Sequence, residues 1–63
     1  MCESAAYFKK GNSEELILGE VARIEPVAGG FRLIGLLGDE MTISGKIEEI
    51  NLLKHKIIFT NDG

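Results

Sequence analysis

The chain holds one cysteine, Cys2, and one histidine, His55, and these side chains are its strongest candidates for metal binding. Cys2 follows Met1 directly, so its thiolate and its own backbone nitrogen can close a small chelate ring on a metal ion. If Met1 is removed, the new α-amine takes the place of that nitrogen. Sulfur and nitrogen donors in equal number suit Ni(II) or Cu(II) in square-planar geometry. One chain supplies half of such a site.

Two copies of Cys2 brought together across a two-fold axis would complete the donor set, because such an axis places a residue beside its own copy. Two other interpretations of Cys2 stay open: a thiol without a special role, and a redox-active or disulfide-forming cysteine. His55 lies between Lys54 and Lys56, where we expect an exposed turn. No residue near it in the sequence completes a metal site with it.

Catalytic chemistry finds little support in the sequence. The acidic residues Glu14–Glu15, Asp39–Glu40 and Glu48–Glu49 are sequence neighbours, so on strands they point to opposite faces and do not pair for acid–base work. The sequence has no recognisable Ser/His/Asp motif and no nicotinamide fingerprint. The segment 35–38, Gly-Leu-Leu-Gly, lacks the lysine of a phosphate-binding loop. We therefore predict that the protein is not an enzyme.

The length of 63 residues predicts a single β-rich domain over residues 1–63. Domains of this size bury a small core and usually depend on a disulfide, a structural metal or a partner chain. One cysteine cannot form a disulfide within the chain, and one histidine excludes the familiar zinc-finger ligand sets. We therefore expect a homodimer.

Composition and charge restrict the classes of partner that the protein can bind. The chain is 44% hydrophobic and 27% charged, which is typical of a globular domain. Its formal net charge of −3 argues against a general nucleic-acid binder, which needs a basic face. No apolar run is long enough for a membrane span or resembles a signal peptide. We expect a cytoplasmic protein with a reduced thiol and no membrane partner.

Turn-forming residues divide the chain into short apolar segments, whose lengths favour strands over helices. The predicted strands are 3–9, 14–18, 20–27, 31–37, 41–44, 46–52 and 56–61. Pro26 suggests a strand end or edge, because proline cannot donate to a ladder. One alternative is a short helix over 45–54, where Ile47, Ile50 and Leu53 have helical spacing.

The segment from Gly19 to Ile24 has the same pattern as the segment from Gly45 to Ile50, 26 residues later. We therefore predict an all-β fold of two related β-meanders, forming a small curled antiparallel sheet or barrel of six to seven short strands. The predicted core is Leu16, Leu18, Val21, Ile24, Phe31, Leu33, Ile43, Ile47, Ile50, Ile57 and Phe59. The apolar residues left for the outside, to be covered by a second subunit, are Ile34, Leu36, Leu37, Leu52 and Ile58.

The opening Met1-Cys2, the segment Leu18-Gly19-Glu20-Val21 and the closing Lys56-Ile57-Ile58-Phe59 resemble the CooT family over essentially the whole chain. These small nickel-binding proteins are associated with nickel insertion into carbon monoxide dehydrogenase. The resemblance implies a cytoplasmic homodimer that binds one Ni(II) through Cys2 of each subunit. It also implies a nickel enzyme or other maturation proteins as partners. Cu(II) or Zn(II) can compete for such ligands.

Family members have also carried the label of predicted RNA-binding protein, so a small β-barrel that binds RNA or single strands is the alternative function. Such binding needs exposed aromatic residues on a positive groove. Here the basic residues are interleaved with acidic ones, and the aromatic residues are mostly assigned to the core. A third possibility is an interaction module that works through its apolar outer face.

Overall fold

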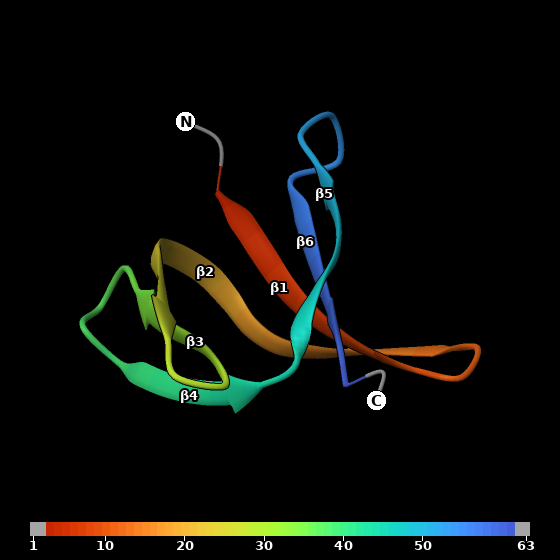
Figure 1. The fold of residues 1–63 in the computed structure, drawn as a ribbon. Coiled ribbons are helices and arrows are strands. Elements are labelled where there is room, and N and C mark those ends of the chain that lie inside the picture. The colour runs from red at the N-terminus through yellow and green to blue at the C-terminus, as the bar shows by residue number, and fades with distance from the viewer. Residues whose placement is uncertain (1–2, 62–63) are drawn as a thin grey trace.

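The computed structural model describes residues 3–61, and all the regular structure in this range is β-strand (Figure 1). The strands are β1 (Ser4–Lys10), β2 (Ser13–Val27), β3 (Gly30–Gly35), β4 (Glu40–Ser44), β5 (Lys46–Asn51) and β6 (Lys56–Thr60). The prediction of an all-β fold is confirmed. The alternative helix over 45–54 does not form, because this segment is the edge strand β5 and the turn after it.

The six strands form one sheet in the order β4-β3-β2-β1-β6-β5. Four of the five neighbouring pairs are antiparallel, whereas β1 and β6 run parallel. The sheet is therefore mixed. It curls strongly without closing, so β4 and β5 are its two edges (Figure 1). Of the two expected forms, a curled sheet or a barrel, the structure has the curled sheet.

β2 is one long bent strand where the sequence predicted two strands, 14–18 and 20–27. Its first half pairs with β1, as in Leu16 opposite Tyr7, and its second half pairs with β3, as in Ile24 opposite Leu33. Gly19 lies between the halves, and a residue without a side chain lets a strand bend without ending. At the equivalent place of the second predicted meander, Gly45 has φ of 125° and separates β4 from β5. These two strands lie at opposite edges of the sheet, so the prediction of a second meander is wrong.

The core lies on the inner face of the curl. Leu33 and Phe59 are completely buried, and the Phe59 ring lies 5.5 Å from that of Phe31 at 51°. Ala6 and Ile57 complete the buried cluster. The half-buried apolar residues packed against it are Phe8, Ile17, Leu18, Val21, Ile24, Phe31, Met41, Ile43 and Ile47.

Two assignments of apolar residues to the core were wrong. Leu16 and Ile50, predicted in the core, are 56% and 54% exposed. Leu16 lies opposite Tyr7 on the outer face after a bulge in the β1–β2 pairing, and Ile50 lies on the edge strand β5. Ile58, predicted for the outer face, lies opposite Tyr7 and outside the core cluster, where the neighbouring strands β1 and β5 bury it.

The folded chain exposes more surface than its mass requires. Five apolar side chains are buried among the described residues, and the accessible surface is 4364 Å². A compact monomer of this mass exposes about 4,000 Å². The open sheet therefore leaves apolar surface in solvent. No helix in the described part of the chain is long and apolar enough to cross a membrane.

Removing one methyl group from the core tests this packing. Ile57 and Ile50 are cross-strand partners, but only Ile57 is buried. We expect Ile57→Val to lower the free energy of unfolding by about 1 kcal/mol. The same change at Ile50 should cost less than half as much. Urea unfolding at a fixed protein concentration measures both values, and equal losses would contradict the described core.

Close backbone packing between β3 and β4 gives a second test. A Cβ at Gly30 would collide with the Ile43 carbonyl oxygen, whereas a Cβ at Gly19 would meet no atom within 4 Å. We expect Gly30→Ala to destabilise the fold by about 1–3 kcal/mol. Gly19→Ala should cause little change. Thermal unfolding followed by circular dichroism compares the two, and a tolerated Gly30→Ala would refute this strand pairing.

Candidate functional site

Cys2 lies outside the described residues, but the structure defines where the chain that follows it enters the sheet. β1 begins at Ser4, which pairs with Val21 of β2. The backbone N–H of Ala5 donates to the carbonyl oxygen of His55, with an N···O distance of 2.9 Å. The start of β1 is therefore held between the bend of β2 and the turn that joins β5 to β6 (Figure 1).

His55 contributes to this end of the sheet through its backbone. Its φ of 55° is left-handed, a conformation that histidine adopts more readily than branched residues do. The sequence predicted an exposed turn residue, and the structure places His55 in the turn but half-buried. The conformation of the turn directs its carbonyl oxygen toward Ala5. In the described structure, the backbone of His55 therefore positions the start of β1.

The turn between β3 and β4 packs beside the bend of β2 at the same end of the sheet. The N–H of Leu36 donates to the Glu20 carbonyl oxygen at 3.1 Å, and the N–H of Gly35 donates to the Asp39 carbonyl oxygen at 2.7 Å. Between the turn and the bend lies an open cavity of about 400 Å³. Its lining residues are Leu18, Gly19, Glu20, Leu36, Leu37 and Asp39.

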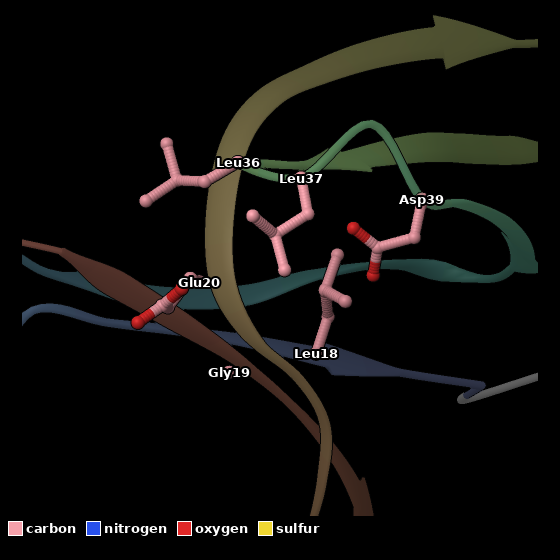
Figure 2. Close-up of a pocket in the computed structure, with 6 residues that line it drawn as sticks. All are labelled: Leu18, Gly19, Glu20, Leu36, Leu37 and Asp39. Atoms are coloured by element: carbon pink, nitrogen blue, oxygen red, sulfur yellow. The ribbon is translucent and has the colours of Figure 1, made fainter.

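The cavity is apolar at its centre and acidic at its margin. Figure 2 shows the side chains of Leu18 and Leu37 directed toward each other, with the Asp39 carboxylate beside them. Leu36 and Glu20 point away from this pair. The lining thus combines leucine side chains with a carboxylate. It offers no nucleophile.

The neighbouring acidic residues Glu48 and Glu49 have different partners in the described structure. Glu48 pairs with Lys9 at 3.7 Å, while Glu49 accepts a hydrogen bond from Asn51 at 3.3 Å. The predicted divergence of neighbouring carboxylates is seen in this pair. Within residues 3–61, no three side chains of His, Cys, Asp or Glu lie close enough together to hold a metal ion.

Most of the cationic side chains lie next to carboxylates. The Arg32 guanidinium donates to one Glu25 oxygen at 2.6 and 3.2 Å, and Arg23 pairs with the other oxygen. The hydrogen bond from Arg32 lowers the pKa of the Glu25 carboxyl, and the charges of both arginines add to this effect against some desolvation. These two arginines therefore share one anion and do not form a free positive groove.

Lys56 is also paired with a carboxylate, on the outer face of the sheet. Its Nζ lies 2.9 Å from Glu14 Oε1 and 4.7 Å from the centre of the Tyr7 ring. The hydrogen bond to Glu14 raises the pKa of Lys56. Tyr7, the aromatic residue nearest to this cation, is thus covered by a paired lysine.

Sequence reasoning found most of the exposed leucines at this end of the sheet. Leu36, Leu37 and Leu52 were predicted outside, and all three are exposed. Leu53, which helical spacing grouped with Ile47 and Ile50, is 93% exposed in the β5–β6 turn. The sequence feature that indicates the exposure of Leu53 is the adjacent pair Leu52-Leu53 directly before Lys54-His55-Lys56.

Comparisons with known proteins agree on one family. The family model described as "CO dehydrogenase accessory protein CooT" matches residues 1–60. A crystal structure of a candidate CooT from Carboxydothermus hydrogenoformans is similar to this chain, with 31% sequence identity and a TM-score of 0.89. The similarity covers 98% of this chain and 100% of the other. Comparison with curated proteins gives no significant match.

The Glu25 ion pair gives a test of the described electrostatics. Because the Arg32 hydrogen bond is the largest influence on Glu25, Arg32→Gln should raise the pKa of Glu25 toward its ordinary value. Arg23→Gln should raise it less. NMR titration of the Glu25 side chain measures both shifts, and a larger effect of Arg23→Gln would contradict the described pairing.

The sign of the pH dependence follows from the same pair. A lowered pKa in the folded state means that ionised Glu25 stabilises the fold above its unfolded-state pKa. This contribution is lost as the pH falls through the folded-state pKa. The stability difference between wild type and Arg32→Gln should therefore shrink as Glu25 becomes protonated.

Proposed function

Because the chain belongs to the CooT family of CO dehydrogenase accessory proteins, we propose that it assists the maturation of that enzyme by holding Ni(II) as cargo. The observation that carries this proposal is the family match over residues 1–60, a range that includes the Met1-Cys2 opening. An accessory protein acts by binding and transfer.

In this proposal Ni(II) is held between two subunits of a homodimer. Each subunit provides the Cys2 thiolate and a nitrogen of the same residue, or the α-amine if Met1 is removed. Thiolate and nitrogen donors in equal number fit square-planar Ni(II). Within one chain the donors would be incomplete, because residues 3–61 provide no cluster of three candidate ligands.

The described start of the chain is compatible with a metal site at the surface. Glu3 is exposed, and β1 begins at the next residue. The Cα of Cys2 lies two residues from that of Ser4, a span of at most about 7 Å. Cys2 is therefore tethered close to the anchored end of β1, from which a partner protein could receive the metal.

The chemistry of the thiolate sets the conditions for loading and release. Cysteine must lose its proton to bind a metal, so loading releases protons and the affinity falls as the pH drops. Cu(II) binds such donors more tightly than Ni(II) does, and Zn(II) also competes. Selection of nickel would then depend on which metal is available and on the square-planar geometry.

The nucleic-acid alternative receives no support from a described contact. Arg23 and Arg32 share Glu25, and Lys56 is paired with Glu14. Binding to phosphates would have to displace these carboxylates. We therefore propose the metal-binding function alone, with a nickel enzyme or its maturation proteins as partners in the cytoplasm.

Titration with Ni(II) tests the proposal. We expect a thiolate-to-metal charge-transfer band that saturates at one metal for every two chains. Cys2→Ser should abolish the band, and lowering the pH should weaken binding in the wild type. Absorption spectroscopy with parallel isothermal titration calorimetry measures the stoichiometry and the affinity.

A moved thiol provides the matched control. The double variant Cys2→Ser/Ser4→Cys keeps one thiol per chain but places it inside β1, where Ser4 pairs with Val21. We expect it to lack the square-planar spectrum. Undiminished nickel binding by Cys2→Ser would disprove the assignment of Cys2 as a ligand.

A further inference from the structure

The two edges of the sheet differ in how well they resist pairing with a further strand. β4 and β5 are the edge strands, and an edge presents backbone N–H and C=O groups that have no partner within the sheet. β5 has a register shift between Ile47 and Glu49, and three of its six residues are charged. Bulges and charges are devices that keep other strands away from an edge. β5 is therefore a protected edge.

β4 lacks these protections beyond its first residue. Its register with β3 is continuous from Glu40 to Ser44, and the four residues after Glu40 are uncharged. Close packing against β3 holds the strand in place, because a Cβ at Gly30 would collide with the Ile43 carbonyl oxygen. Figure 1 shows β5 turning away from β4 at their junction, and no described strand pairs with this edge. β4 thus offers a firmly held and uncovered template.

Two hydrogen bonds at the ends of β4 show which of its backbone groups are free. The Gly35 N–H donates to the Asp39 carbonyl oxygen at 2.7 Å, and the Gly45 N–H donates to the Gly29 carbonyl oxygen at 3.3 Å. Bonded and non-bonded residues alternate along an antiparallel pair, so the odd-numbered residues of β4 bond to β3. The residues whose N–H and C=O groups point toward the open edge are Glu40, Thr42 and Ser44.

The side chains of β4 define which kind of segment can pair with it. Met41 and Ile43 are half-buried on the inner face, where they pack against the core. Apolar side chains at the facing positions of an added strand would lie beside these two residues and extend the apolar layer. Glu40, Thr42 and Ser44 are exposed on the outer face. A matching segment therefore alternates apolar and polar residues.

Charge adds a requirement at one end of the edge. Glu40 begins β4 directly after Asp39, and within residues 3–61 neither carboxylate forms an ion pair. The neighbouring cation Arg32, opposite Thr42 on β3, already pairs with Glu25. A basic side chain opposite Glu40 on an added strand would therefore meet two carboxylates that have no cation of their own.

We propose that the free edge of β4 binds an extended segment of a partner protein as a seventh, antiparallel strand. The segment has apolar residues opposite Met41 and Ile43 and a basic residue opposite Glu40, which in antiparallel order is at its C-terminal end. Main-chain hydrogen bonds provide the affinity in this mode of recognition, and the alternate side chains provide the specificity. The inference goes beyond the proposed function, because it holds whichever metal the chain carries.

The β4 edge is separate from the start of β1. The strand order places β3 and β2 between β4 and β1, so the two strands lie three spacings apart, roughly 14 Å along the sheet. A segment paired with β4 does not occupy the end of the sheet from which the chain leads to Cys2. Docking at β4 and nickel loading can therefore be measured independently.

A short capped peptide of sequence Thr-Val-Thr-Val-Lys tests the edge, because it has the required alternation and terminal charge. Amide NMR spectra of the protein are recorded during titration with this peptide. We expect shift changes along β4 and slower amide exchange at Thr42, with no change along β5. The control peptide Thr-Thr-Val-Val-Lys has the same composition without the alternation, and at the same concentration it should leave the β4 amides unchanged.

Two substitutions test the backbone and the charge separately. Thr42→Pro removes the central outward donor, which β3 does not use, so the fold should persist while peptide binding is lost. Glu40→Lys should weaken binding of the lysine peptide by about threefold or more and favour a peptide with glutamate in place of lysine. Glu48→Lys makes the same change on β5 and should leave the affinity unaltered. This charge exchange decides the proposal even if Thr42→Pro does not fold.

The outcomes separate this edge from the metal proposal. Cys2→Ser should bind the peptide as the wild type does, so peptide binding without nickel binding would refute the metal proposal alone. Nickel binding with no β4 shifts at millimolar peptide, or with shifts centred on β5, would overturn the edge alone. If the β4 amides shift with protein concentration in the absence of peptide, a second copy occupies the edge and the proposed partner segment is refuted.

Discussion

Parallel hydrogen bonding between β1 and β6 joins the two ends of the described chain in the middle of the sheet. The register runs from Ala5 opposite Lys56 to Lys9 opposite Thr60. On one side of this ladder lie β2, β3 and β4, and on the other lies β5. Ala6, Ile57 and Phe59 enter the core from these two strands. Loss of this ladder would therefore separate β5 and β6 from the other four strands and divide the core.

The same ladder controls the candidate site. Its first residue, Ala5, is also the donor to His55, so the pairing that builds the core also fixes the start of β1. The curl of the sheet leaves two turns rich in leucine on either side of this point. A chain this short has few apolar residues to spare, and four fully exposed or half-exposed leucines are a large share of them.

Much of the fold could be predicted because local signals suffice for it. Short apolar segments between turn residues indicated the strands. Of the eleven predicted core residues, Leu33, Ile57 and Phe59 are buried, and six more occupy the half-buried layer around the core. The errors came from features without a local signal. A bulge after Ala6 moved Leu16 to the outer face, and the position of β5 at an edge exposed Ile50. A parallel pair between distant strands leaves no periodic pattern, so the predicted antiparallel sheet lacked the β1–β6 ladder.

The sequence by itself determined the strand content, the family and the identity of the candidate ligand, because these depend on residue type and local order. Cys2 as the one thiol, and the Met1-Cys2 opening, can be read without a fold. Only the tertiary structure decided that Ser4, Glu20, Leu36 and His55 lie along one end of the sheet, since their neighbourhood comes from hydrogen bonds between distant segments. It also decided that the leucines of two separate turns flank the start of β1. Residue types indicated what could bind a metal, and the folding of the sheet decided which segments lie beside the start of β1.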